Sequence, residues 1–259
     1  MRLRLILPLL LVLVPSLVAG RGAPSGSPEE DAAVLSLMHR AAEERRQGDY
    51  AAAAETYRQV LRRAPGLFEA HLFLADTLRK RRLDADAERE LQVARRIRPE
   101  DPLPYVGLAD LRREAFRFRE ALALLEEGWN VVPPERREPL LAAQGTALRQ
   151  AGEAEKAVEL LARGIKDFPS SIRIPEALAR SQEACGRLVD ALATWTLAVR
   201  RAPDNASLSL ALQEAREMAL GMERAEAAAR KAGAGADSWE ELARLRMVGR
   251  QFPPAAEAS

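Results

Sequence analysis

The sequence predicts an all-α fold, a right-handed α-solenoid of antiparallel helix pairs, from three observations. Ala, Leu, Arg and Glu dominate the 259 residues and aromatic residues make up only 5% of them, a composition typical of helical proteins. Prolines recur at a nearly constant interval, and small residues recur at constant distances before each proline. Self-similarity at a fixed period is typical of stacked repeats.

The repeat interval is marked by five prolines. They are Pro65, Pro99, Pro133, Pro169 and Pro203, separated by 34, 34, 36 and 34 residues. Because proline cannot continue a helix, each is expected to end the second helix of one pair and to begin the turn into the next. The first helix is expected to begin at about Pro28, where Ser27 and Glu30 form a capping box.

Four further columns keep register with these prolines. Small residues lie 24 positions before each one (Ala41, Ala75, Ala109, Gly145, Ala179) and 12 positions before it (Ala53, Ala87, Ala121, Ala157, Ala191). A large residue lies 8 positions before it (Tyr57, Leu91, Leu125, Leu161, Trp195), and Val, Ala or Gly lies 5 positions before it (Val60, Ala94, Gly128, Gly164, Ala198). Small residues let the two helices of a pair approach closely, and the large residue on the same helical face fills the space that is left.

The turn between the two helices of a pair has a column of its own. Gly48, Gly152 and Gly186 occupy it, and a left-handed residue is favoured there. Arg82 and Phe116 stand in the same column of the second and third pairs.

These columns resemble the tetratricopeptide repeat from about Val34 to Pro203, roughly two thirds of the chain. The resemblance implies about five repeats over residues 28–205. A degenerate sixth repeat is expected over residues 206–236, a C-terminal capping helix over residues 237–250, and a disordered tail over residues 251–259. A capping helix would cover the open end of the stack, which would otherwise aggregate.

The first twenty residues predict a signal peptide. Arg2 and Arg4 precede an apolar run that ends near Pro15 and small residues, and cleavage is expected before Arg21. Residues 21–27 would then be a linker. The alternative is a membrane anchor formed by residues 5–19, although spanning a bilayer takes roughly 20 apolar residues. The expected location is therefore periplasmic or secreted, with contact to a membrane only if this segment stays uncleaved.

No pattern in the sequence indicates catalysis. His39 and His71 are the two histidines, and Cys185 is the lone cysteine, so neither an intrachain disulfide nor a cysteine metal site is expected. The spacings typical of nucleotide-binding loops, zinc proteases and serine hydrolases are missing. We expect no catalytic residue, cofactor or metal, and the formal net charge of +1 argues against a nucleic-acid partner.

The resemblance to the tetratricopeptide repeat also implies a concave groove lined by the first helix of each repeat. The positions carried over from the family give a candidate protein-binding groove of Leu72, Asp76, Arg79, Val106, Asp110, Arg113 and Arg149. Arginines in register could hold carboxylates of an acidic segment or of a chain terminus. They could equally be a solvated face of an Arg-rich protein, and Asp76 and Asp110, one turn earlier, could partly neutralise them.

The predicted function is that of a non-catalytic scaffold or adaptor that binds a protein or an extended peptide segment. It is expected to be exported and to act in a bacterial periplasm or cell envelope. The alternative is an N-terminally membrane-anchored assembly factor, or an accessory subunit of an enzyme complex.

Overall fold

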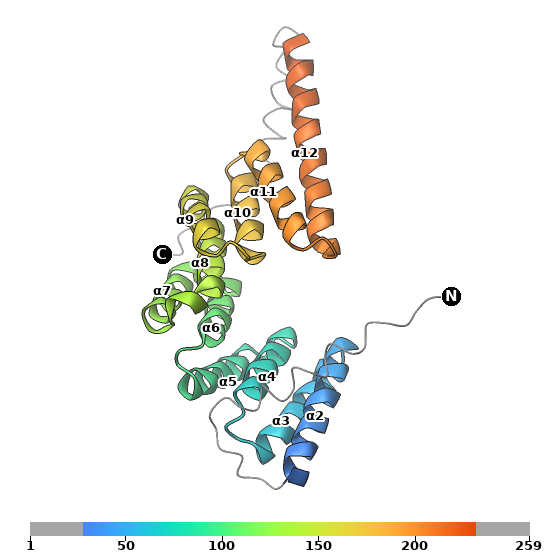
Figure 1. The fold of residues 1–259 in the computed structure, drawn as a ribbon, viewed down its shortest axis with the longest axis vertical. Helices are drawn as coiled ribbons and strands as arrows, with labels where there is room; N and C mark the ends of the chain where they lie inside the picture. Colours follow the sequence, from blue (N-terminus) through green and yellow to red (C-terminus); the bar gives the residue numbers. More distant parts are fainter. Residues whose placement is uncertain (1–27, 232–259) are drawn as a thin grey trace, which may run out of the picture. The chain divides into compact units, whose positions relative to one another are not determined.

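The computed structural model describes residues 28–231, which contain eleven α-helices, one short 3-10 helix and no strand (Figure 1). The predicted all-α solenoid is therefore confirmed. The first helix begins at Pro28. The helices are α2 (Pro28–Arg46), α3 (Tyr50–Arg63), α4 (Phe68–Lys80), α5 (Asp84–Ile97), α6 (Pro102–Glu114), α7 (Phe118–Val131), η1 (Pro134–Arg136), α8 (Glu138–Gln150), α9 (Ala154–Asp167), α10 (Arg173–Ala184), α11 (Leu188–Arg201) and α12 (Ala206–Lys231).

Several predicted segments lie outside the described residues. They are the signal peptide at 1–20, the linker at 21–27, the capping helix at 237–250 and the tail at 251–259. The chain divides into two compact units at Arg98 and Pro99. The N-terminal unit holds the helix pairs α2/α3 and α4/α5. The C-terminal unit holds the pairs α6/α7, α8/α9 and α10/α11, followed by α12.

The small and large residues of the repeat columns form the cores of both units, because all twenty of these positions are buried. The third pair shows how the columns work together. Ala109 on α6 and Ala121 on α7 leave room for Leu125, which is only 1% exposed. Glycine is needed where a large side chain lies too close to the helix backbone to leave room for a Cβ atom. A Cβ atom on Gly145 would lie 2.6 Å from Cγ of Leu161 and 2.7 Å from its Cδ2.

Each first helix ends in the same left-handed turn. Gly48, Gly152 and Gly186 have φ values of 84°, 83° and 74°, while Arg82 and Phe116 have values of 60° and 58°. The backbone N–H groups of these residues and of their successors donate to carbonyls of the preceding turn, as in a Schellman motif. At Phe116, for example, the distance from its N to the carbonyl oxygen of Arg113 is 3.0 Å. All five residues of the predicted turn column are therefore left-handed.

The predicted sixth repeat differs from the structure. A further repeat would need two helices, but residues 206–231 form the single helix α12. Leu220 stands in the turn column, 17 residues after Pro203, as Phe116 stands 17 residues after Pro99. Leucine pays a steric cost in the left-handed conformation, as Arg82 and Phe116 do, but at Leu220 the chain stays helical. The two extra residues near Pro134 fall in the loop that contains η1.

We expect Gly145→Ala to destabilise the protein. In a helix, alanine is ordinarily more stable than glycine by roughly 0.5–1 kcal/mol. Here the new methyl group would overlap the fully buried Leu161, and overpacking costs about 1–3 kcal/mol. The matched control is Gly221→Ala on α12, where a Cβ would meet nothing within 4 Å. Urea unfolding followed by circular dichroism should show a lower midpoint for the first variant and an unchanged or higher one for the control. Equal gains in both variants would show that the helices of the fourth repeat do not cross as closely as described.

Candidate functional site

The predicted groove residues all lie on first helices and are partly exposed. In the N-terminal unit, α4 carries Leu72, Asp76 and Arg79. In the C-terminal unit, α6 carries Val106, Asp110 and Arg113, and α8 carries Arg149. Each helix presents its residues on one face because their spacing is three or four positions.

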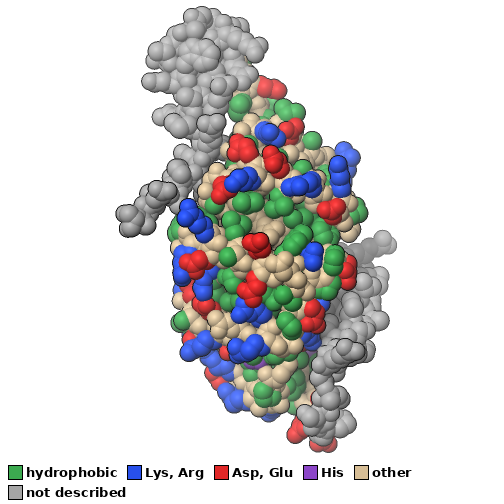
Figure 2. All heavy atoms as spheres, turned by 90° about the vertical axis from the view of Figure 1, so that its left-hand side faces the viewer, with side chains coloured by type: hydrophobic (Ala, Val, Ile, Leu, Met, Phe, Trp, Pro, Cys, Tyr) green, Lys and Arg blue, Asp and Glu red, His purple; other side chains and the backbone are tan. Residues whose placement is uncertain are grey.

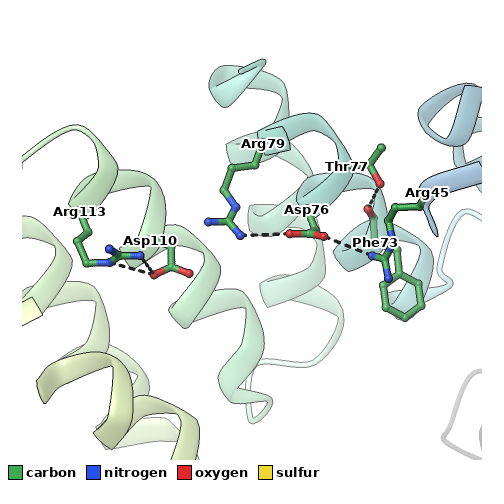
Figure 3. Close-up of polar contacts among 7 residues, drawn as sticks. All are labelled: Arg45, Phe73, Asp76, Thr77, Arg79, Asp110 and Arg113. Atoms are coloured by element: carbon green, nitrogen blue, oxygen red, sulfur yellow. Dashed lines mark hydrogen bonds and ion pairs between the residues drawn. The ribbon is translucent and has the colours of Figure 1, made fainter. Parts of the chain in front are cut away.

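In the N-terminal unit one aspartate lies between two arginines (Figure 3). The carboxylate of Asp76 accepts from Arg79 at 3.1 Å, one turn along α4, and from Arg45 on α2 at 3.4 Å. The guanidinium of Arg45 also lies over the ring of Phe73, 5.1 Å from its centroid. This face therefore combines two cations, one anion and an aromatic ring that is 36% exposed.

In the C-terminal unit Arg113 pairs with an aspartate one turn earlier on its own helix, as Arg79 does in the N-terminal unit. The carboxylate of Asp110 accepts from Arg113 at 2.9 Å on the same helix (Figure 3). Arg113 also donates to the side-chain oxygen of Gln150 on α8, at 3.0 Å. The i,i+3 pairing expected from the sequence is therefore confirmed for both aspartates.

Arg149, Arg180 and Glu183 form a second charged group in the C-terminal unit. Burial lowers the pKa of Arg149, and the positive charges of Arg180 and Arg113 lower it further, while Glu183 raises it. Arg180 on α10 pairs with Glu176 at 3.2 Å. These effects show that guanidinium groups from three successive first helices lie within electrostatic range of one another.

Glu183 completes this second group, and sequence reasoning did not include it in the site. It occupies the position where the four preceding repeats carry Arg45, Arg79, Arg113 and Arg149. The indole Nε1 of Trp195 donates to its Oε1 at 2.6 Å. Burial raises the pKa of Glu183, against the lowering effects of Trp195 and of the nearby arginines. The reversal of charge within a column of arginines was a signal that could have identified this residue.

The arginines do not form a line of exposed positive charge. The side chains of Arg79 and Arg113 are only 23% and 21% exposed, and both are paired with aspartate. The face drawn in Figure 2, on the side of α7 and α9 in Figure 1, also shows Lys and Arg interspersed with Asp and Glu, so mixed charge is not confined to the first helices. On α6 the charged pair is preceded by Leu103, which is 44% exposed, and by Val106. A ligand of these faces would therefore meet apolar side chains as well as charge.

The two histidines lie in different environments. His39 is exposed on α2, whereas His71 is buried on α4. The Nδ1 atom of His71 lies 2.6 Å from Oε2 of Glu90, and its Nε2 atom lies 2.9 Å from the carbonyl oxygen of Pro65. His71 thus connects α4 to α5 and to the preceding proline turn. Among residues 28–231, no group of three or more His, Cys, Asp or Glu side chains is placed to hold a metal ion.

This architecture defines a class, the helix-repeat proteins built from stacked antiparallel pairs. A family model described as tetratricopeptide repeat matches residues 44–105. That match and the five columns described above show a tetratricopeptide-repeat architecture from about Val34 to Pro203. None of the described helices is both long enough and apolar enough to cross a membrane.

Solved structures show the same fold. A thermophilic tetratricopeptide-repeat protein from Thermus thermophilus is 24% identical; the match covers 70% of this chain and 98% of that one, with a TM-score of 0.60. PilF of Pseudomonas aeruginosa is 17% identical, with coverages of 88% and 95% and a TM-score of 0.56. PilW, a type IV pilus biogenesis factor, is 18% identical, with coverages of 88% and 97% and a TM-score of 0.55. No curated protein matches this chain in sequence.

We expect His71 to make the stability of the protein depend on pH. Burial opposes its charge, but the hydrogen bonds to Glu90 and to the Pro65 carbonyl outweigh this effect and raise the pKa of His71 above 6.5. Its stabilising contribution is then complete below the unfolded-state pKa and is lost as pH rises through the higher folded-state pKa. Unfolding free energies measured between about pH 6 and pH 8.5 should therefore fall more steeply for wild type than for His71→Gln. Parallel curves would contradict the assigned hydrogen bonds.

Proposed function

We propose that this chain is a non-catalytic scaffold that binds an extended segment of another protein through the first-helix faces of its repeats. The observation that carries this proposal is the repeated display of an arginine one turn after an aspartate on successive first helices, at Asp76 and Arg79 and at Asp110 and Arg113. Tetratricopeptide-repeat architecture supports the scaffold role, since each repeat adds a similar first helix to the binding surface.

The contacts within these faces restrict the chemistry of the ligand. Arg79 and Arg113 already bind carboxylates of the chain itself, so an acidic ligand would have to compete with Asp76 and Asp110. Exposed Leu103 and partly exposed Val106 offer apolar contact beside the charged pair. We infer that the preferred segment carries both apolar and charged side chains, and that electrostatics sets its register more than its affinity.

We further propose that the scaffold acts outside the cytoplasm, in a bacterial periplasm or cell envelope. The support is the sequence of residues 1–20, with two arginines, an apolar run and a small-residue exit. The alternative proposal is a chain anchored by residues 5–19 that acts as an assembly factor or as an accessory subunit of an enzyme complex.

Binding through the first-helix faces can be tested once a partner has been captured by crosslinking in cells. Replacing Arg79, Arg113 and Arg149 together by Gln should weaken binding about tenfold, or by about 1.4 kcal/mol. The control replaces Arg62, Arg163 and Arg200 by Gln, which removes the same charge from exposed positions on second helices. Isothermal titration calorimetry should find the control close to wild type. Equal affinity of both triple variants, each with wild-type circular dichroism, would place the binding surface elsewhere.

The export proposal predicts a defined N-terminus. Mass spectrometry of the protein recovered from the periplasm or the medium should give a chain that starts near Arg21. An intact chain starting at Met1 in the membrane fraction would instead support the anchored alternative.

A further inference from the structure

The turn between α6 and α7 presents an aromatic side chain to solvent. Phe116 is 77% exposed and lies at the tip of this turn, in the C-terminal unit. The ring of Phe118 lies beside it, with centroids 6.1 Å apart and an edge-to-face angle of 83°. The two rings thus form a small ordered apolar tip.

Folding alone does not account for phenylalanine at this position. Phe116 has a φ of 58°, a conformation that glycine adopts without steric cost and that crowds the Cβ atom of every other residue. Glycine fills the equivalent turn at Gly48, Gly152 and Gly186. Because the ring of Phe116 is 77% exposed, its burial contributes little stability that could offset the cost of the backbone conformation. Such a departure from the favoured residue points to a role outside the fold.

The charges around the tip are mostly positive. Between Ala115 and Arg119 there are two arginines and no acidic residue. Arg119 is exposed, and the side chain of Arg117 is 54% exposed although it pairs with Glu120 at 2.6 Å. Glu120 also lies 3.4 Å from Arg112, and exposed Glu114 precedes the tip. The two phenylalanines therefore alternate along the chain with two exposed arginines, Arg117 and Arg119.

We propose that this turn binds the surface of an anionic lipid bilayer, with Phe116 and Phe118 in the interfacial region and Arg117 and Arg119 on lipid phosphates. Transfer of an aromatic ring from water to the interface between headgroups and acyl chains lowers its free energy. Arginines near an anionic leaflet add electrostatic attraction. A protruding tip suits a deformable surface, since it needs no matching pocket. The contact is weak on its own, and it is independent of the protein-binding function proposed above.

The test measures binding to vesicles of the chain that starts at Arg21, because the apolar run within residues 1–20 could itself enter a bilayer. The vesicles are phosphatidylcholine alone or phosphatidylcholine with about one third phosphatidylglycerol. The decisive variant is Phe116→Gly, which removes the ring and relieves the left-handed strain, so it should fold at least as well as wild type. The matched control is Arg82→Gly, which relieves the same strain at the other non-glycine turn, where φ is 60°. Co-sedimentation gives the partition coefficient, and hydrogen exchange reports on the amides of residues 114–120.

We expect Phe116→Gly to bind anionic vesicles about fivefold or more weakly than wild type and Arg82→Gly to bind like wild type. Wild type should also show slower exchange at residues 114–120 when anionic vesicles are added, and no such change with phosphatidylcholine alone. Equal binding of Phe116→Gly and wild type, with no protection at these amides, would overturn the proposal. So would loss of a captured protein partner in Phe116→Gly with vesicle binding intact, because that result would make the tip a protein contact.

Discussion

The close approach of the two helices within each repeat is the contact on which the rest of the structure depends. It requires a small residue on each helix, such as Ala109 facing Ala121, and one large side chain to fill the space between them. Where the gap is smallest, even a methyl group is too large, as at Gly145 against Leu161. Because packing at the crossing is already complete, the position of one helix fixes that of its partner.

The same constraint determines how polar residues are displayed. Once a first helix packs through its small-residue column, its remaining residues fall on fixed faces. Asp76 and Arg79 on α4 therefore have the same relation to each other as Asp110 and Arg113 on α6. The pairs neutralise one another, so these faces offer directional donors and acceptors rather than a strong field. Recognition by such faces would depend on the order of side chains along a ligand.

The turns between paired helices are the places where the chain departs from its own pattern. Five of them share the left-handed residue and the same capping hydrogen bonds, although Arg82 and Phe116 replace glycine. At Leu220 the pattern fails altogether, and α12 continues. Arg82 and Phe116 thus adopt the left-handed turn although neither is glycine, whereas Leu220 does not. A turn residue alone does not decide whether a helix ends.

The sequence by itself determined the all-α fold, the register of five helix pairs and the helical face on which each candidate residue lies. These features follow from residue size and spacing, which act locally and repeat. Only the tertiary structure decided the partners of the charged groups. Arg113 meets Gln150 across 37 positions, and Trp195 donates to Glu183 from a different helix. Such contacts depend on the angle at which two helices cross and on the rotamer of each side chain. The recurrence of similar residues at one repeat position specifies neither of these.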